Sequence, residues 1–252
     1  MIFVGREKET KQIQRALERG ENVILSGKYG IGRTRLIKHV ADTTRDRWDF
    51  IFLDFSQTPG KVCQILMAAL WPEEKAKGRR KTFPYKSSRF RITNAAFRDP
   101  RPPVLVLDNI VKLSAPKLDL IRYLISGGQF RFVAIVEAFV PENDLFRLRA
   151  WLRPALRIEL PHLRVENSRE FFQYAAMKHH LNWTKSQMES LAEATRGYPL
   201  GMREVVNRKI ASSRGLDVLM SLPRVKNHKI AVSSGQTMLR SKLLGSGWRR
   251  QL

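Results

Sequence analysis

The feature that most constrains the fold is a glycine-rich segment, G-K-Y-G-I-G-R-T, at residues 27–34. A short apolar run at residues 23–26 precedes it, and a helical pattern that carries Leu36, Ile37 and Val40 follows it. Glycines at this spacing let backbone N–H groups turn inward around an anion, and the next helix adds the positive end of its dipole. This order of elements predicts a strand, a phosphate-binding loop and a helix within a parallel α/β sheet.

The residue types of this loop point to nucleotide phosphates and Mg²⁺. The Thr34 hydroxyl is the expected magnesium ligand. Arg33 stands where this pattern usually has lysine, and a planar guanidinium is expected to bind phosphate in a different pose from an ammonium. Lys28 offers a second cation, while the alternative is a glycine-rich turn that binds no ligand. The expected nucleotide contacts in and beside the loop are Gly27, Lys28, Tyr29, Gly30, Ile31, Gly32, Arg33, Thr34 and Arg35.

Polar residues follow two of the later predicted strands, which lie at residues 50–55, 104–107 and 132–136. Asp108 ends the middle one of these strands, and a carboxylate there is expected to hold Mg²⁺ directly or through water. Asn109 stands where a glutamate would polarise an attacking water, and an amide is a very poor base.

Glu137, at the tip of the following strand, is a candidate for that catalytic duty. A surface or ion-paired carboxylate is an equal alternative.

The last part of the chain changes from an alternating to a helical pattern near residue 161. Residues 167–170 and 184–187 resemble capping boxes, and a Gly-Tyr-Pro break at 197–199 precedes a helix at 200–210. We therefore expect a nucleotide-binding α/β domain with a parallel sheet over residues 1–160, a small helical lid over 161–212 and a basic C-terminal tail over 213–252.

The charge of the chain is strongly unbalanced, with 46 Lys and Arg against 23 Asp and Glu and a net charge of +23. Such a protein usually meets a polyanion, and we expect nucleic acid. An anionic membrane is a weaker candidate because no basic amphipathic helix stands out, and a solvated basic surface is the other alternative.

A basic insertion at residues 75–91 contains no acid and has Phe83, Tyr85 and Phe90 interleaved. We expect it to bind nucleic acid with little sequence preference and strong salt dependence. The predicted contacts are Lys75, Lys77, Arg79, Arg80, Lys81, Lys86, Arg89 and Arg91. The basic tail is a second candidate, with docking to a partner protein as its alternative.

A single cysteine, Cys63, excludes an internal disulfide and a multi-cysteine metal site. It lies in an apolar helical pattern and is expected in the core. The sequence shows no signal peptide and no apolar stretch near 18 residues, so we expect no membrane partner and a cytoplasmic protein that associates with the nucleoid when bound to DNA.

Four features together resemble AAA+ P-loop ATPases: the start at residues 3–7, the glycine loop, the strand that ends in Asp108 and the break at 197–199. The resemblance covers roughly residues 1–212. It is greatest to the origin-recognition and STAND-like branch, and it extends to ATPase regulators of DNA transposition. It implies ATP and Mg²⁺ as cofactors.

The resemblance also implies roles for residues outside the loop. Val4, Gly5 and Arg6 would lie near the adenine, and Pro199 would cap the base from the lid. Arg203 would match a sensor of the γ-phosphate, and Glu137 occupies the place of the first sensor. An arginine finger would reach the nucleotide of a neighbouring subunit, with Arg153 as first candidate and Arg149 as second. A solvated or phosphate-binding arginine is the alternative for each.

We therefore expect an ATP-binding AAA+ protein that forms homo-oligomers through arginine-finger interfaces on double-stranded DNA and regulates or recruits an enzyme such as a transposase. Because Arg33 and Asn109 depart from the family pattern, hydrolysis is expected to be slow or impaired. The alternatives are a STAND-like oligomeric signalling switch, against which the short chain after residue 212 counts, and a nucleotide-free nucleic-acid-binding scaffold.

Overall fold

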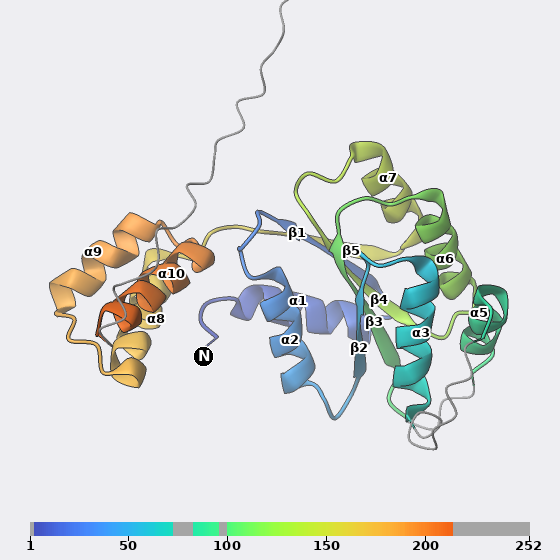
Figure 1. Cartoon of the computed structure of the whole chain (residues 1–252), viewed down its shortest axis with the longest axis horizontal. Coiled ribbons are helices and arrows are strands. Elements are labelled where there is room, and N and C mark those ends of the chain that lie inside the picture. Colours follow the sequence, from blue (N-terminus) through green and yellow to red (C-terminus); the bar gives the residue numbers. More distant parts are fainter. Residues whose placement is uncertain (1–2, 73–82, 96–99, 214–252) are drawn as a thin grey trace, which may run out of the picture. The chain divides into compact units, whose positions relative to one another are not determined.

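The computed structural model describes residues 3–72, 83–95 and 100–213. Its centre is a sheet of five parallel strands in the order β2-β3-β4-β1-β5 (Figure 1). The strands are β1 Asn22–Gly27, β2 Asp49–Asp54, β3 Pro103–Ile110, β4 Arg131–Val136 and β5 Ala155–Leu160. The expected α/β class with a parallel sheet is confirmed.

Helices cover both faces of the sheet (Figure 1). They are α1 Glu7–Glu18, α2 Arg33–Thr43, α3 Pro59–Leu70, α5 Tyr85–Thr93, α6 Ala115–Ser126 and α7 Glu142–Trp151. Apolar residues of α1 and α2 pack on one face with Val104 and Val106, whereas α3, α5, α6 and α7 pack on the other with Leu105 and Leu107. Alternate residues of β3 are therefore buried on opposite faces, as expected of a central parallel strand.

The sequence pattern missed the strand β5. This strand pairs with β1 along its whole length, from Asn22 with Ala155 to Gly27 with Leu160. It lies at the edge of the sheet and exposes Arg157 and Glu159, so it lacks the continuous apolar run that marks the other strands.

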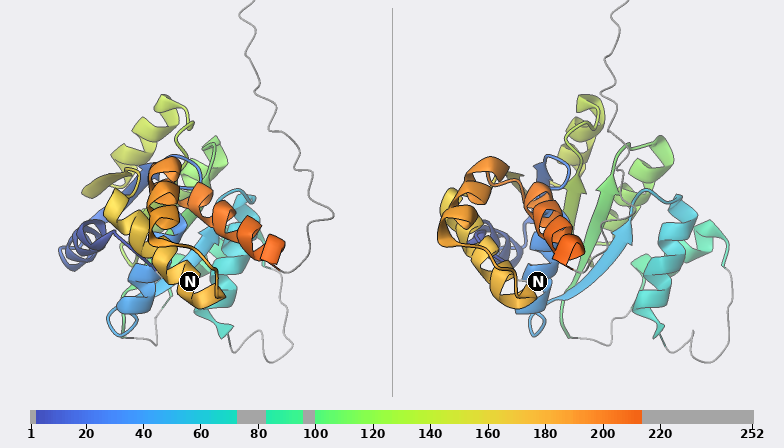
Figure 2. Two further views of the ribbon diagram at one scale, coloured as in Figure 1. Left: turned by 90° about the vertical axis from the view of Figure 1, so that its left-hand side faces the viewer. Right: turned by 60° about the vertical axis from the view of Figure 1, so that its left-hand side comes forward.

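Three helices follow β5, namely α8 Val165–His179, α9 Lys185–Thr195 and α10 Pro199–Ser213. These helices lie against one another (Figure 2). They pack around an apolar cluster that includes Phe172 and Met202. The capping box that begins α9 is confirmed, with Thr184 and Gln187 bonded in both directions. The predicted box at residues 167–170 is wrong, because α8 begins two residues before Asn167.

Some of the predictions from the sequence fall on residues that the structure does not describe. The basic insertion is described only from residue 83, and residues 75–81 and the tail from 214 onward lie outside the described residues. The proposed boundary between an α/β domain and a lid near residue 160 stays a prediction.

Cys63 is buried in the core, as expected, and its burial raises the pKa of the thiol to about 11. Among the described helices, none is long and apolar enough to cross a membrane.

Candidate functional site

The glycine loop connects β1 to α2, as the sequence predicts. Gly30 and Gly32 have φ angles of 74° and 95°, in the left-handed region that favours glycine, and Gly32 caps the start of α2. A side chain at Gly30 would lie within 2.7 Å of Leu200, whereas one at Gly32 would meet nothing within 4 Å. The loop is therefore closely packed at Gly30 and open at the start of the helix, where an anion is favoured.

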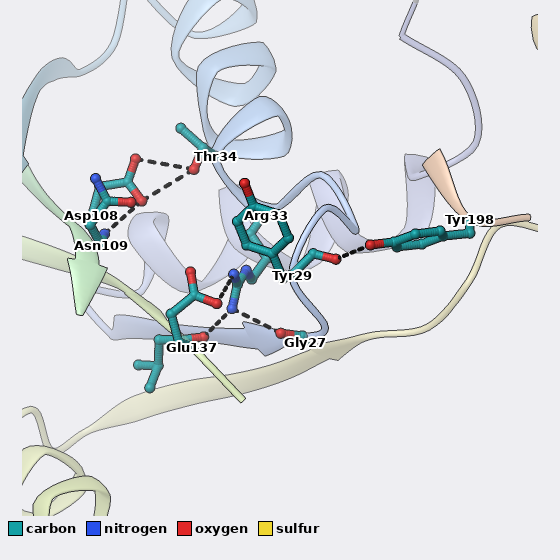
Figure 3. Close-up of polar contacts among 9 residues, drawn as sticks. Gly27, Tyr29, Arg33, Thr34, Asp108, Asn109, Glu137 and Tyr198 are labelled. Carbon is teal, nitrogen blue, oxygen red and sulfur yellow. Dashed lines mark hydrogen bonds and ion pairs between the residues drawn. The ribbon is translucent and has the colours of Figure 1, made fainter. Parts of the chain in front are cut away.

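The two predicted magnesium ligands lie in direct contact beside this loop. The Thr34 hydroxyl donates to the Asp108 carboxylate, with distances of 3.1 Å to Oδ1 and 3.0 Å to Oδ2 (Figure 3). Both supply the hard oxygen atoms that Mg²⁺ prefers. With these two oxygen donors, the residues fit a Mg²⁺ that completes its shell with water and phosphate oxygens. Within the described residues no three His, Cys, Asp or Glu side chains form a metal cluster.

The Arg33 side chain is buried between the ends of two strands. Its Nη1 donates to the carbonyl oxygens of Gly27, at 2.8 Å, and of Val136. Its Nη2 lies 2.5 Å from Oε2 of Glu137 (Figure 3). The guanidinium is thus engaged by β1 and by the end of β4. Glu137 is therefore ion-paired in the structure. Its catalytic role stays a prediction.

Asn109 lies next to a carboxylate that the sequence analysis missed. Its φ of 59° is left-handed, which asparagine tolerates better than most residues, and its Nδ2 donates to Asp54 Oδ1 at 3.2 Å. Asp54 ends β2 and pairs in register with Asp108. Hydrogen bonds from Ser56 above all, with others from Asn109 and Gln57, lower the pKa of Asp54 to about 2. Because the ends of parallel strands meet at one edge of a sheet, the position of Asp54 at the end of a predicted strand could have identified it as a site residue.

A cavity of about 430 Å³ lies beside the loop. This volume suits a small-molecule ligand. Many of the sequence-predicted residues line it: Val4, Arg6, Tyr29, Gly30, Ile31, Gly32, Arg33, Thr34, Arg35, Asn109, Glu137, Pro199 and Arg203. Five apolar residues that the sequence analysis did not select complete the wall: Phe3, Leu163, Phe171, Leu200 and Met202. Gly5, Gly27, Lys28 and Asp108 are not among its lining residues.

The segment before α1 is fixed to the start of the helical region. Arg6 is buried, and its guanidinium donates to the Pro161 carbonyl at 2.6 Å and pairs with Glu9 at 3.1 Å. A side chain at Gly5, whose φ is 54°, would lie 2.3 Å from Asn167. These contacts explain why residues at the start of the chain line the same cavity as residues of α8 and α10. The adenine contacts expected of Val4, Gly5 and Arg6 stay predictions.

The break before α10 contacts the tip of the loop. The Tyr198 hydroxyl donates to the Tyr29 carbonyl at 2.7 Å (Figure 3), and its ring stacks on His162 with ring centroids 5.6 Å apart. Burial raises the pKa of Tyr198, so the hydroxyl keeps its proton at neutral pH. From the sequence, this break was expected to precede a helix and to be a family feature, but its contact with the loop was not predicted.

The candidate arginine fingers lie outside this cavity. Arg149 pairs with Glu142 within α7 at 2.8 Å, and Arg153 is exposed between α7 and β5. Neither lines the cavity wall, whereas Arg203 does. Contact between these two arginines and a neighbouring subunit stays a prediction.

The described part of the basic insertion uses its arginines in packing. Arg89 pairs with Asp119 at 2.7 Å and lies over the rings of Tyr85 and Tyr123. Arg91 lies over Trp71 and Phe83. Lys86 and Phe90 are exposed on the same helix. Nucleic-acid contacts remain a prediction for this insertion, and Lys75, Lys77, Arg79, Arg80 and Lys81 lie outside the described residues.

Comparisons with known proteins agree with this geometry. The family model of the AAA ATPase domain matches residues 2–136. The fold is similar to the Thermotoga maritima RuvB Holliday junction branch migration motor, with 20% identity and a TM-score of 0.58 over 84% of this chain and 65% of that chain. It is also similar to the Aeropyrum pernix Orc1 protein in complex with DNA, with 15% identity and a TM-score of 0.60 over 84% of this chain and 62% of that one.

A third similar structure is the S. cerevisiae Hsp104–ADP complex, with 18% identity and a TM-score of 0.54 over 84% of this chain and 31% of that chain. No curated protein matches the sequence. The chain thus spans less than two thirds of the length of each of these three solved chains, and at these identities the likeness concerns the fold.

Proposed function

Because the chain belongs to the AAA ATPase domain family, we propose that it binds ATP with Mg²⁺ and assembles as a homo-oligomer on double-stranded DNA. The observation that carries the nucleotide part is the contact between Thr34 and Asp108 beside the open start of α2. The Thr34 hydroxyl and Asp108 would hold Mg²⁺, which supplies charge neutralisation at the phosphates. The apolar part of the cavity, with Phe171 and Met202, would receive the base.

Slow hydrolysis is part of this proposal. Asn109 stands after Asp108 where a base is needed, and its amide is held by Asp54. Glu137, the other candidate base, is paired with Arg33 at 2.5 Å. A carboxylate that is engaged by a buried guanidinium is not free to orient an attacking water. Nucleotide would then act mainly to stabilise an assembly rather than to drive rapid turnover.

The DNA part of the proposal is supported by the net charge of +23. A similar fold occurs in an Orc1 protein in complex with DNA and in a branch migration motor that acts on Holliday junctions. We propose largely sequence-nonspecific binding through phosphates, in a nucleoid setting, and recruitment or regulation of a DNA-processing enzyme such as a transposase. A nucleotide-free scaffold is the second candidate, and the engagement of Arg33 by protein groups favours it.

A thermal-shift titration of the full chain with Mg-ATP tests the nucleotide part. A ligand that binds the native state stabilises it by about 2.7 kcal/mol at a concentration 100 times its Kd, so the melting temperature should rise with ATP. Fluorescence anisotropy with labelled duplex DNA, with and without ATP at moderate salt, tests ATP-dependent assembly. No shift at millimolar ATP would favour the scaffold.

A further inference from the structure

We propose that Glu137 sets the preference of this site for nucleotides by competing with their phosphates for the Arg33 guanidinium. The inference rests on the proposed nucleotide site and adds a specificity-determining residue to it. In this view Arg33 and Glu137 act as one unit, so the Arg33 guanidinium is not available to a phosphate until the pair separates.

The Arg33 guanidinium is held by protein groups. As the first residue of α2 it begins at the mouth of the loop, yet its side chain is only 6% exposed. It reaches the carbonyls of Gly27 and Val136 and the carboxylate of Glu137. A forked guanidinium can hold these partners on two strands at once, which is how an arginine at this position is diverted from the loop.

Arg33 and Glu137 carry opposite charges that lie in contact. The two groups lie 2.5 Å apart, and the Glu137 side chain is 12% exposed, so their charges offset each other with little screening by solvent. Both residues line the same cavity as Thr34. An anion that enters beside Thr34 therefore meets a neutral pair rather than a free cation.

The ion pair between Arg33 and Glu137 is open to exchange with a phosphate. Glu137 Oε2 is buried, and within the described residues no hydrogen bond from any group other than Arg33 reaches it, so exchange needs the loss of one partner only. A terminal phosphate offers a guanidinium several oxygens and a bidentate arrangement. The phosphate group can therefore replace the carboxylate as partner of Arg33, and each further phosphate on the nucleotide strengthens that competition.

Arg33→Lys alone should therefore fail to produce an ordinary phosphate-binding loop. The ammonium introduced there would still face Glu137, and the carboxylate would continue to neutralise it. Removal of the carboxylate in Glu137→Gln, by contrast, frees the guanidinium and removes a negative charge from the cavity wall.

The test is calorimetric titration of the full chain with Mg-ATP, Mg-ADP and AMP. Glu137→Gln should raise the affinity for ATP about tenfold, raise that for ADP less than about threefold and leave AMP unchanged. Arg33→Lys should gain little, and adding Glu137→Gln to it should recover the ATP gain. Glu21→Gln, which breaks an ion pair with Arg19 outside the cavity wall, is the matched control and should change nothing.

The outcomes separate this inference from the proposed function. An unchanged ratio of ATP to ADP affinity in Glu137→Gln, with wild-type binding intact, would overturn the role of Glu137 and leave the nucleotide site standing. Absence of ATP binding in wild type and in every variant would overturn the proposed function itself. If nucleotide-free melting shows that Glu137→Gln does not fold, Arg33→Lys decides alone, because a clear gain in ATP affinity in that variant would overturn the role of Glu137.

Discussion

The Tyr198 hydroxyl donates a hydrogen bond of 2.7 Å to the main-chain carbonyl of Tyr29, at the tip of the glycine loop. This bond connects the break before α10 with the loop between β1 and α2. The same region is closely packed, since a side chain at Gly30 would lie 2.8 Å from the Tyr198 hydroxyl. The loop conformation therefore depends on a residue far away in the sequence.

Tyr198→Phe should weaken this connection without changing the shape of the ring. One neutral hydrogen bond contributes about 0.5–1.5 kcal/mol, so the free energy of unfolding should fall by that amount, and nucleotide should dissociate faster. Urea unfolding and stopped-flow displacement of a fluorescent ATP analogue measure the two effects. Tyr174→Phe on α8, outside the cavity wall, is the control. Equal effects of both substitutions would contradict a role for the Tyr198–Tyr29 bond.

Thr34→Ala should reduce the contribution of Mg²⁺ to ATP binding. Its hydroxyl contacts Asp108, and both supply the oxygens expected to hold the metal. We expect the affinity for ATP to fall about tenfold with Mg²⁺ present and to change less than about twofold in EDTA, because a lost metal ligand matters only when the metal is bound. Thr34→Ser keeps the hydroxyl and should behave as wild type in calorimetric titration. A loss of the same size in EDTA would contradict the assignment.

Asn109→Glu should destabilise the protein before it affects catalysis. A glutamate at a φ of 59° costs about 1–2 kcal/mol, and its carboxylate would stand against Asp54, which Asn109 now contacts at 3.2 Å. Chemical denaturation should show a loss of about 1–3 kcal/mol at neutral pH.

Adding Asp54→Asn should recover part of that stability, because the like charge is removed. Turnover of ATP above the wild-type rate is expected only in this double variant, and a phosphate-release assay measures it. Equal stability of the single and double variants would show that Asp54 does not act on position 109.

The pH dependence of stability should carry a contribution from Asp54. Its pKa is lowered from 3.8 to about 2 in the folded protein, so the folded state favours the ionised carboxylate. The stabilisation is fully present above pH 3.8 and is lost as the pH falls toward 2. The difference in unfolding free energy between wild type and Asp54→Asn should therefore shrink between pH 5 and pH 2, measured by urea unfolding. A constant difference would contradict the shift.

Substitution of two basic residues of α5 should affect different properties, namely DNA binding for Lys86 and stability for Arg89. Lys86→Ala should leave stability unchanged and weaken DNA binding, with the slope of log K against log salt reduced by about 0.9 if Lys86 contacts one phosphate. Arg89→Ala should lower stability by about 1–3 kcal/mol, because it removes an ion pair with Asp119 and contacts with two tyrosine rings. Anisotropy titrations at several salt concentrations and thermal unfolding provide the two measurements.

Local patterns made most of the fold predictable. The loop and the strand that ends in Asp108 are each visible within a few residues, and the meeting of Thr34 with Asp108 follows from the parallel topology. The edge strand β5 lacked such a pattern because its exposed Arg157 and Glu159 interrupt the apolar run.

The partner of Arg33 was not predictable in the same way. The sequence shows that Arg33 is unusual at its position and that Glu137 could be an ion-paired carboxylate. It does not show that these two residues pair with each other. Pairing of side chains at the tips of two strands depends on how the strands are ordered in the sheet, with β4 beside β1. Asp54 did carry a signal, because it ends a predicted strand, but its contact with Asn109 depends on β2 lying beside β3.

The buried Cys63 has a practical consequence for these experiments. With its pKa raised to about 11, only a very small fraction of the thiol is ionised near neutral pH, and the thiolate is the species that reacts with maleimides. It is the single cysteine of the chain. A cysteine introduced at an exposed position such as Lys86 would therefore react first, and fluorescent probes or spin labels can report on DNA or subunit contacts without prior removal of the native thiol.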